Sequence, residues 1–409
     1  MNEASLTYLQ RYVLNRQEKY LATTMFNLAK MYKLRRGIDL EKLANSLAMA
    51  GRSHQALLST LHKFPNGEVL QRQELDEEDI QVEIVKVPER NLLARRASYV
   101  KIFDLLDDGL VDAVIFDCGV NSYLLSNIHH LVCDGYSFPL ILDDAHRVWN
   151  GEEIVQDNYY EILHLRNGHM NTPMALATRN FIKELLRSKH FTSILPRDCF
   201  REAGCGTYEV ELSIPEDFDK FLALRRATRH HVFLAASALA LARMTDSEDV
   251  LIDWVFHGRI SKDELRTVGA FMVDLPLIFE GISTLTASDI ITNVKQSTFR
   301  GIKNTRSISS IDDMNPNGDE RLTFIYQDRW GELMTPGIVD PEGPFAWMIE
   351  ETISLRQNLN MAENPMNVEI MEHKDSTKLF LEYDSGRYRE ETIRRYADEF
   401  QRALTWLVN

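Results

Sequence analysis

The chain has 409 residues, of which 44% are apolar, so it can bury a large core in one or two domains. Its formal net charge of −15 argues against nucleic acid as the main partner, because neutralising phosphates requires a dense basic surface. The sequence has neither a signal-peptide pattern nor a run of about twenty uncharged apolar residues. We therefore expect a cytoplasmic protein without a membrane span. The cysteines lack CxxC or histidine-rich spacing, so we expect free thiols and no metal site.

Patterns in the first half of the chain favour a mixed α/β structure. Apolar residues recur at helical spacing over 40–61, and two apolar runs of strand length, 111–119 and 122–130, flank a turn at Gly119. Residues 137–151 are typical of a helix with Ser137 as its N-cap and Gly151 as its stop. The turn between the second strand and this helix is a place where a reactive side chain can be exposed.

The second half of the chain also alternates between helical and strand patterns. Pro173 marks the start of a helix over 172–188, and further apolar periodicity predicts helices and strands after it. The expected helices cover 215–229, 232–244 and 389–408, and the expected strands cover 207–213, 250–256, 267–279, 322–328, 364–373 and 377–384. Both halves therefore predict a mixed α/β lobe.

The heptapeptide HHLVCDG, residues 129–135, carries the strongest chemical signal. Imidazole is the side chain best matched to proton transfer near neutral pH, and Asp134 and Gly135 lie in the turn that follows His129 and His130. If the strand continues through both histidines, their side chains face opposite sides, and only one of them can enter a shared channel. Cys133 has no separate base, so we interpret it as a buried thiol.

With this motif, the chain resembles the condensation domains of nonribosomal peptide synthetases, within the chloramphenicol-acetyltransferase-like acyltransferase superfamily. The resemblance spans nearly the whole chain. Besides HHLVCDG, the similar segments are 6–14, 37–61, 102–110, 256–259 (FHGR), 268–277 (VGAFMVDLPL) and 381–393.

The resemblance implies an α/β (α+β) fold of two chloramphenicol-acetyltransferase-like lobes in a V-shaped pseudodimer with a central tunnel. The N-terminal lobe, 1–168, carries the HHxxxDG motif, and the C-terminal lobe is 169–409.

The resemblance also implies a role for each residue of the motif. His130 is the working histidine, either as a base or as a positioning group, and His129 is structural. Asp134 forms a structural ion pair, for which Arg259 is the expected partner. The alternative is that Arg259 lies in the tunnel wall. Gly135 lets the turn approach a thioester closely. The predicted site is therefore His130, His129, Asp134 and Gly135, supported by Arg259.

The implied reaction is formation of an amide between a donor acyl or peptidyl thioester and the amine of an acceptor aminoacyl thioester. Donor and acceptor carrier proteins are the expected partners, and their 4′-phosphopantetheine arms arrive with the substrates, so we expect no cofactor of the domain itself. We expect a monomer or a part of a multidomain synthetase. Two alternatives remain: a stand-alone acyltransferase for a free amine or alcohol, and a non-catalytic recruitment domain.

Several supporting positions depart from the family pattern. Ser53, His54 and Gln55 stand where the second motif has Arg-His-Glu, and Leu58 replaces its later arginine. In the strand motif of the second lobe, Val273 replaces an asparagine and Ile278 an arginine. These changes indicate a divergent substrate, an unusual acceptor or a domain whose chemistry has drifted.

Overall fold

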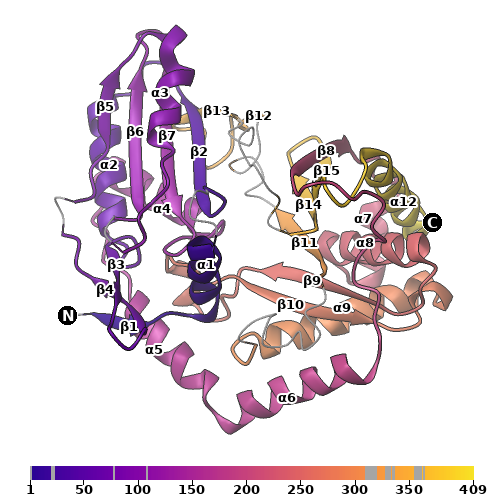
Figure 1. The fold of residues 1–409 in the computed structure, drawn as a ribbon. Coiled ribbons are helices and arrows are strands. Elements are labelled where there is room, and N and C mark those ends of the chain that lie inside the picture. Colours follow the sequence, from indigo (N-terminus) through magenta and orange to yellow (C-terminus); the bar gives the residue numbers. More distant parts are fainter. Residues whose placement is uncertain are drawn as a thin grey trace. The chain divides into compact units, whose positions relative to one another are not determined.

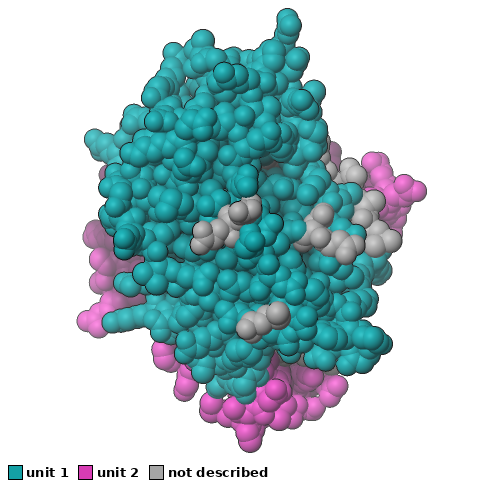
Figure 2. All heavy atoms as spheres, turned by 90° about the vertical axis from the view of Figure 1, so that its left-hand side faces the viewer, with its two compact units in different colours: residues 1–169, 257–272, 332–358 teal, residues 170–256, 273–331, 359–409 magenta. Residues whose placement is uncertain are grey.

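The structure is a computed structural model that describes residues 2–19, 24–76, 79–106, 109–308, 320–327, 333, 337–353, 362 and 364–409. The chain forms two compact units (Figure 2). Unit 1 consists of residues 1–169, 257–272 and 332–358, and unit 2 of residues 170–256, 273–331 and 359–409. Two segments that follow residue 168, namely 257–272 and 332–358, therefore belong to the first unit.

Unit 1 contains a short sheet, a larger sheet and helices. Its helices are α1 (Tyr8–Lys19), α2 (Leu40–Arg52), α3 (Leu92–Tyr99), α4 (Ser137–Trp149) and α5 (Tyr159–Met170), which reaches the unit boundary. Its strands are β1 (Glu3–Ser5), β2 (Asn27–Leu34), β3 (Ser59–Lys63), β4 (Val69–Gln73), β5 (Glu83–Lys86), β6 (Val111–Asp117), β7 (Ser122–His129), β12 (Gly337–Ile338) and β13 (Ile349–Ile353). Two one-turn helices, η1 (Glu89–Asn91) and η2 (Glu264–Arg266), complete its described elements.

The larger sheet of unit 1 places the HHLVCDG motif at the end of a central strand. Within the described residues its order is β12-β13-β2-β7-β6-β5, and β7 runs antiparallel to both of its neighbours (Figure 1). Leu125 of β7 packs in one apolar cluster with Leu92 of α3, whereas Ile128 packs in another with Phe138 of α4. Because successive residues of a strand face opposite sides, α3 and α4 cover opposite faces of this sheet.

Unit 2 consists of a mixed sheet and the helices around it. Its helices are α6 (Pro173–Ser188), α7 (Phe218–Arg225), α8 (Arg229–Thr245), η3 (Ile282–Thr284), α9 (Ala287–Asn304) and α12 (Glu390–Val408). Its strands are β8 (Cys205–Glu211), β9 (Val250–Phe256), β10 (Val273–Phe279), β11 (Leu322–Gln327), β14 (Met366–Glu372) and β15 (Thr377–Asp384). The described sheet has the order β10-β9-β11-β14-β15-β8, with β11 parallel to β9 and β14.

The core of unit 2 forms around α8. Every residue of α8 from Val232 to Ala242 is buried, which is typical of a helix that is apolar on all sides. Its N-terminus is fixed by a capping box, in which Thr228 and His231 bond to each other's backbone N–H groups. α12 and the sheet pack around α8 in one continuous apolar cluster.

Most elements expected from the sequence are present, with ends that differ by at most four residues, as at Arg225 of α7 against the expected 229. Asp328, the last residue of one expected strand, lies outside the described residues, as do Asp107 and Asp108 of the segment 102–110. No helix in the described part of the chain is long and apolar enough to cross a membrane.

The expected helix over 40–61 is wrong beyond residue 52. α2 ends at Arg52, and β3 begins at Ser59. Between them, the amide of Gln55 donates to the carboxylate of Asp157, and the amide of Asp157 donates to the carbonyl of Ser53. These contacts with a distant segment take the place of helical hydrogen bonds, which periodicity alone does not reveal.

The expected strand over 267–279 is wrong in its first six residues, since β10 begins at Val273. The amides of Val268, Gly269 and Phe271 donate to side chains of Asp157, Ser137 and Asp134, respectively. The backbone of this segment therefore bonds to side chains of unit 1 and not to a neighbouring strand.

Candidate active site

The backbone at the end of β7 sets the directions of the two motif histidines. The amide of His129 donates to the carbonyl of Leu110, on the β6 side, at 2.9 Å. The amide of His130 donates to the carbonyl of Phe26, on the β2 side, at 2.8 Å. Strand-like alternation thus continues through His130, and the two side chains face opposite sides of the sheet.

His129 is enclosed and has no exposed surface. Its ring makes an edge contact with Phe103 at 5.9 Å between centroids and another with Phe26. Its Nδ1 accepts a hydrogen bond from the amide of Leu131 at 3.3 Å. Burial, helped by the neighbouring His130, lowers the pKa of His129 to about 3, so it stays neutral.

His130 has part of its surface exposed, as do Gly135 and Tyr136, whereas residues 131–134 are buried. Burial of most of the His130 ring lowers its pKa, and Lys30 acts in the same direction, against the opposing effects of Asp134 and the Cys133 backbone. Nδ1 of His130 makes no hydrogen bond within the described residues. A neutral, partly accessible imidazole of this kind can accept a proton.

Asp134 is completely buried and accepts hydrogen bonds on both carboxylate oxygens. Arg259 donates to Oδ2 at 2.8 Å and to Oδ1 at 3.1 Å, which is a forked charged contact. The amide and hydroxyl of Ser137 bond to Oδ1 at 3.0 and 2.8 Å, and the amide of Phe271 bonds to Oδ2 at 3.0 Å. Burial would raise the pKa of Asp134, but Arg259 and these donors hold it below its ordinary value.

Arg259 is equally enclosed. Its remaining N–H groups donate to the carbonyls of His257, Thr267 and Gly269 at 3.1 to 3.3 Å. Its guanidinium also lies 4.6 Å from the ring centroid of Tyr136 and 4.9 Å from that of Phe271. Because both charged groups are surrounded by partners, the pair holds the turn in place and leaves Asp134 no oxygen directed only at His130.

Ser137 has a different role from the expected N-cap. It is the first residue of α4, and Tyr136 occupies the N-cap position without a side-chain hydrogen bond. The carboxylate of Asp134 binds the Ser137 amide instead, so the aspartate caps the helix while it pairs with Arg259.

Two glycines of the site differ in whether the backbone at their position requires a glycine. Gly258 has a φ of +73°, and a Cβ there would lie 1.8 Å from the carbonyl oxygen of Phe271, so no other residue fits. Gly135 is not among the glycines with a positive φ. That its missing side chain makes room for a thioester stays a prediction.

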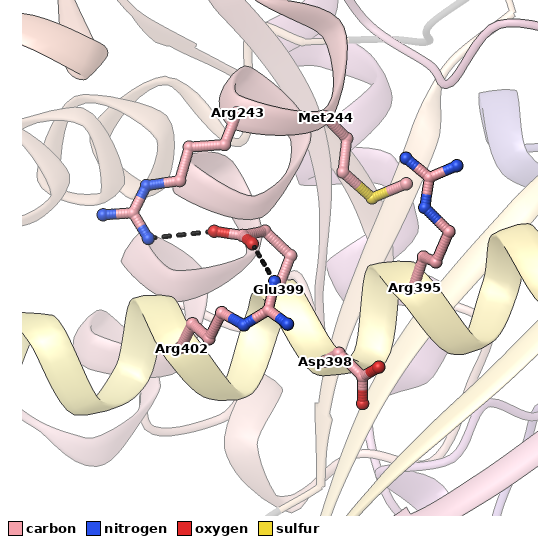
Figure 3. Close-up of a pocket in the computed structure, with 6 residues that line it drawn as sticks. All are labelled: Arg243, Met244, Arg395, Asp398, Glu399 and Arg402. Carbon is pink, nitrogen blue, oxygen red and sulfur yellow. Dashed lines mark hydrogen bonds and ion pairs between the residues drawn. The ribbon is translucent and has the colours of Figure 1, made fainter.

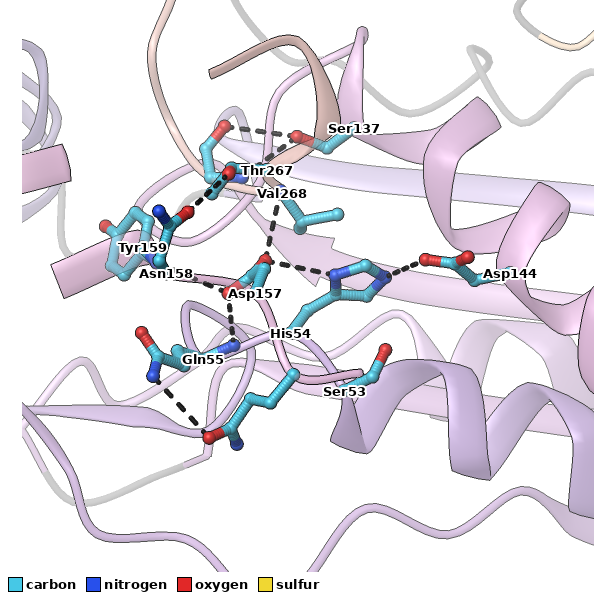
Figure 4. A network of polar contacts seen from close by, with 12 residues as sticks. Ser53, His54, Gln55, Ser137, Asp144, Asp157, Asn158, Tyr159, Thr267 and Val268 are labelled. Carbon is cyan, nitrogen blue, oxygen red and sulfur yellow. Dashed lines mark hydrogen bonds and ion pairs between the residues drawn. The ribbon is translucent and has the colours of Figure 1, made fainter. Parts of the chain in front are cut away.

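A second polar network joins four segments of unit 1: the turn after α2, helix α4, and residues 157–159 and 267–268 (Figure 4). Nδ1 of His54 lies 3.1 Å from Oδ2 of Asp157, and its Nε2 lies 3.5 Å from Asp144 of α4. Asp157 also accepts from the amides of Gln55 and Val268. The network thus connects the turn after α2 to the segment that carries the partners of Asp134.

The structure locates three of the residues that depart from the family pattern. Leu58 is buried in the apolar cluster that contains Leu131 and Phe138, so an apolar residue suits its position. Val273 and Ile278 are residues of β10, in unit 2.

Sequence reasoning missed Asp157, Arg166 and the role of Ser137. Arg166 donates to the carboxylate of Glu264 at 2.9 Å and to the carbonyl of Gly258. No local pattern marks Asp157 or Arg166, because their partners lie about 90 to 110 positions away in the sequence. The role of Ser137 depends in the same way on Arg259 and Gly269, which lie 122 and 132 positions away. The role of a buried charged residue can be assigned only when its partner is known.

A surface pocket in unit 2 has a different chemical character. Arg243 and Met244 at the end of α8, with Arg395, Asp398, Glu399 and Arg402 of α12, line it (Figure 3). Glu399 accepts from Arg243 at 3.0 Å and from Arg402 at 3.1 Å. No histidine, cysteine or hydroxyl-bearing side chain is among the residues that line this pocket, and its Glu399 carboxylate already accepts from two arginines.

The cysteines, all within the described residues, are free. Burial raises the pKa of Cys133 well above its ordinary value, which keeps this thiol protonated and unreactive. Among the described residues, no three histidine, cysteine, aspartate or glutamate side chains are grouped to hold a metal ion.

Comparison with known proteins shows to which family the chain belongs. The family model for the condensation domain matches residues 1–307. The chain belongs to the condensation-domain family. Gramicidin S synthase 2 of Aneurinibacillus migulanus is 21% identical over 407 residues, which cover 94% of this chain and 9% of that protein. Tyrocidine synthase 3 of Brevibacillus parabrevis is 22% identical over 286 residues, 68% of this chain and 4% of that protein.

This condensation domain therefore corresponds to less than a tenth of the length of these two relatives. Among solved structures, the condensation domain of the Monacolin K polyketide synthase MokA has a TM-score of 0.81 at 17% identity. The match covers 100% of this chain and 98% of that one. The fold of the chain is thus that of condensation domains, as the resemblance in sequence implied.

Proposed function

We propose that this condensation domain forms an amide bond between a donor acyl or peptidyl thioester and the amine of an acceptor aminoacyl thioester. The observation that carries the proposal is the state of His130: a partly exposed imidazole, with its pKa lowered, in a turn immobilised by a buried ion pair. One relative, ataP of Aspergillus terreus, is a nonribosomal peptide synthetase by name, which supports an amide as the product.

The proposed reaction needs one proton acceptor and no covalent enzyme intermediate. The amine nitrogen attacks the thioester carbon, the C–N bond forms, and the C=O electron pair moves to oxygen. His130 takes the proton that the nitrogen loses, the carbon–sulfur bond breaks as the carbonyl reforms, and the sulfur leaves as a thiol with that proton. A neutral imidazole is competent for this transfer, and holding both substrates together supplies much of the acceleration.

In this proposal the donor and acceptor arrive on carrier proteins, each on a 4′-phosphopantetheine arm. The thioester chemistry belongs to those arms, and the domain supplies the base and the geometry. Asp134 and Arg259 act as positioning residues, because their hydrogen bonds fix the turn that carries His130.

The test is a condensation assay with loaded donor and acceptor carrier proteins and mass spectrometric detection of the product. We expect His130→Ala to reduce the rate by about 100-fold or more while the melting temperature changes little. His190→Ala, at an exposed histidine of unit 2, is the matched control and should keep full activity. Turnover by His130→Ala at the wild-type rate would contradict the proposal.

A second arm of the assay separates carrier-bound from free acceptors. The same donor thioester is offered the acceptor amine either on a carrier protein or free in solution. Faster reaction with the carrier-bound amine supports the proposal, whereas equal or faster reaction with the free amine assigns the chain to stand-alone acyltransferases. Stable binding of carrier protein without product from either acceptor indicates a recruitment domain.

A further inference from the structure

A third histidine, His257, occupies a fixed position beside the HHLVCDG turn. It directly precedes Gly258 and Arg259. The backbone of Gly258 packs so closely against the carbonyl of Phe271 that no Cβ would fit between them, which fixes the position of this segment. Nδ1 of His257 accepts a hydrogen bond from the amide of Arg259 at 3.2 Å. Because Nδ1 is an acceptor, the proton of the neutral ring is on Nε2.

The ring of His257 also stacks on Tyr136, the residue after Gly135. The ring centroids are 4.8 Å apart, with 26° between the planes. The guanidinium of Arg259 lies 4.6 Å from the Tyr136 centroid, so the stacked pair rests on the buried ion pair. His257 and Tyr136 are partly exposed, while Arg259 and Asp134 are buried. The ring of His257 therefore lies beside the residue that follows Gly135, and like His130 it keeps part of its surface exposed.

The charges around His257 keep it neutral. Burial lowers its pKa to about 4, and the cationic groups of Arg259 and Arg166 act in the same direction. Asp134 and Glu264 oppose them, but both carboxylates already accept from those arginines. At neutral pH the ring thus holds a single proton, on Nε2, and acts as a hydrogen-bond donor there. A neutral imidazole N–H can polarise a carbonyl group.

We propose that His257 is a second substrate-contacting histidine of the site, whose Nε2–H donates a hydrogen bond to the carbonyl oxygen of the acyl thioester. This inference rests on the proposed function. When the amine adds to the carbonyl carbon, this oxygen receives the C=O electron pair, and it returns the pair when the carbon–sulfur bond breaks. Tyr136 holds the ring in position, His130 handles the proton, and His257 stabilises the negative charge on oxygen.

Two conservative variants separate this catalytic role from a structural one. The side-chain amide of glutamine places an N–H near the position of Nε2, so His257→Gln retains the donor. The side-chain oxygen of asparagine mimics Nδ1, so His257→Asn retains the bond from the Arg259 amide but loses the donor. In the condensation assay, we expect His257→Ala and His257→Asn to lower kcat about 100-fold with little change in KM, and His257→Gln to recover about a tenth or more of kcat.

The opposite pattern would overturn the inference: rescue by asparagine and not by glutamine assigns His257 to structure alone, and so does a kcat within about threefold of wild type for all variants. If the wild-type domain itself makes no amide, the proposed function fails, and binding still tests His257. The probe is the amide analogue of acetyl-pantetheine, in which N–H replaces sulfur. We expect it to shift the Nε2–H resonance of His257 downfield in the wild-type protein, with no such signal in His257→Asn; an unshifted resonance at saturating probe contradicts the inference.

Discussion

Asp134 is the residue on which the geometry of the site depends. Its carboxylate receives two donors from Arg259, two from Ser137 and one from Phe271, all in the interior of unit 1. A buried ion pair of this kind costs desolvation for both groups, and its removal on one side leaves the other charge uncompensated. Its value therefore lies in fixing a unique position for the turn.

We predict that Asp134→Asn destabilises the protein by about 3 to 5 kcal/mol, because the guanidinium of Arg259 then remains buried without its counter-charge. Denaturant unfolding of both proteins measures this difference. Asp398→Asn, at an exposed position of α12, is the control and should change stability by less than about 0.5 kcal/mol. A melting curve of Asp134→Asn equal to that of wild type would mean that the ion pair does not hold the fold.

The same residue predicts a pH dependence of stability. The folded-state pKa of Asp134 lies below its ordinary value of 3.8. The stabilisation from its ionised form is therefore fully present above that value, and it is lost as the pH falls through the lower, folded-state pKa. The difference in unfolding free energy between wild type and Asp134→Asn should stay constant from about pH 5 to 8 and shrink below about pH 4. A difference that grows on acidification would contradict this.

His130 predicts a pH dependence of activity. Because burial lowers its pKa from the ordinary 6.5, the imidazole remains an unprotonated base in mildly acidic solution. We expect the acidic limb of the kcat profile to have its midpoint below pH 6.5. Profiles recorded with a donor and acceptor whose own groups do not titrate there measure it, and a midpoint above 6.5 would show that the base is another group.

At the level of elements, the segment after β9 illustrates how a turn is fixed by a single glycine. Gly258 and Gly151 have similar backbone angles, with φ of +73° and +82°, but only the first is packed against other backbone atoms. The two glycines therefore form a matched pair for separating conformational strain from steric clash.

We predict that Gly258→Ala destabilises the protein by at least about 3 kcal/mol, since left-handed strain adds to a clash with the Phe271 carbonyl. Gly151→Ala should cost only about 1 kcal/mol, because nothing lies within 4 Å of the added Cβ. Thermal unfolding of the two variants compares them directly. Equal losses would indicate that the segment relaxes away from Phe271.

At the level of the whole molecule, the chain leaves unit 1 after α5, builds much of unit 2, and returns with residues 257–272 before continuing into β10. The returning segment brings Arg259 and the amide of Phe271 to Asp134. Unit 1 is therefore not encoded by the first 169 residues alone.

We predict that a fragment of residues 1–169 does not fold cooperatively, because Asp134 would then be buried without Arg259 and without the amide of Phe271. A second fragment, in which a flexible linker joins residues 257–272 to residue 169, should recover part of the structure. Circular dichroism melting and amide NMR spectra measure both. A cooperative transition in the shorter fragment would show that the returning segment is dispensable for folding.

Much of the local structure follows from the sequence, because it depends on neighbours in the chain. Two apolar runs of strand length on either side of a turn at Gly119 predicted β6 and β7, and the spacing of HHLVCDG placed two histidines and a carboxylate in one turn. The family resemblance added Arg259 as the expected partner of Asp134, and the structure brings these two residues together.

What the tertiary structure decided is the set of contacts between distant segments. Arg259 lies 125 positions from Asp134, and the amide of Phe271 lies 137 positions from it. The ends of α2 and of β10 also depend on such contacts, since Asp157 and Asp134 take amides that periodicity assigned to a helix and a strand. Hydrophobic periodicity reports which face of an element is buried, whereas a hydrogen bond between distant groups depends on where the folded chain brings them, and this is why only the structure revealed His257 beside the site.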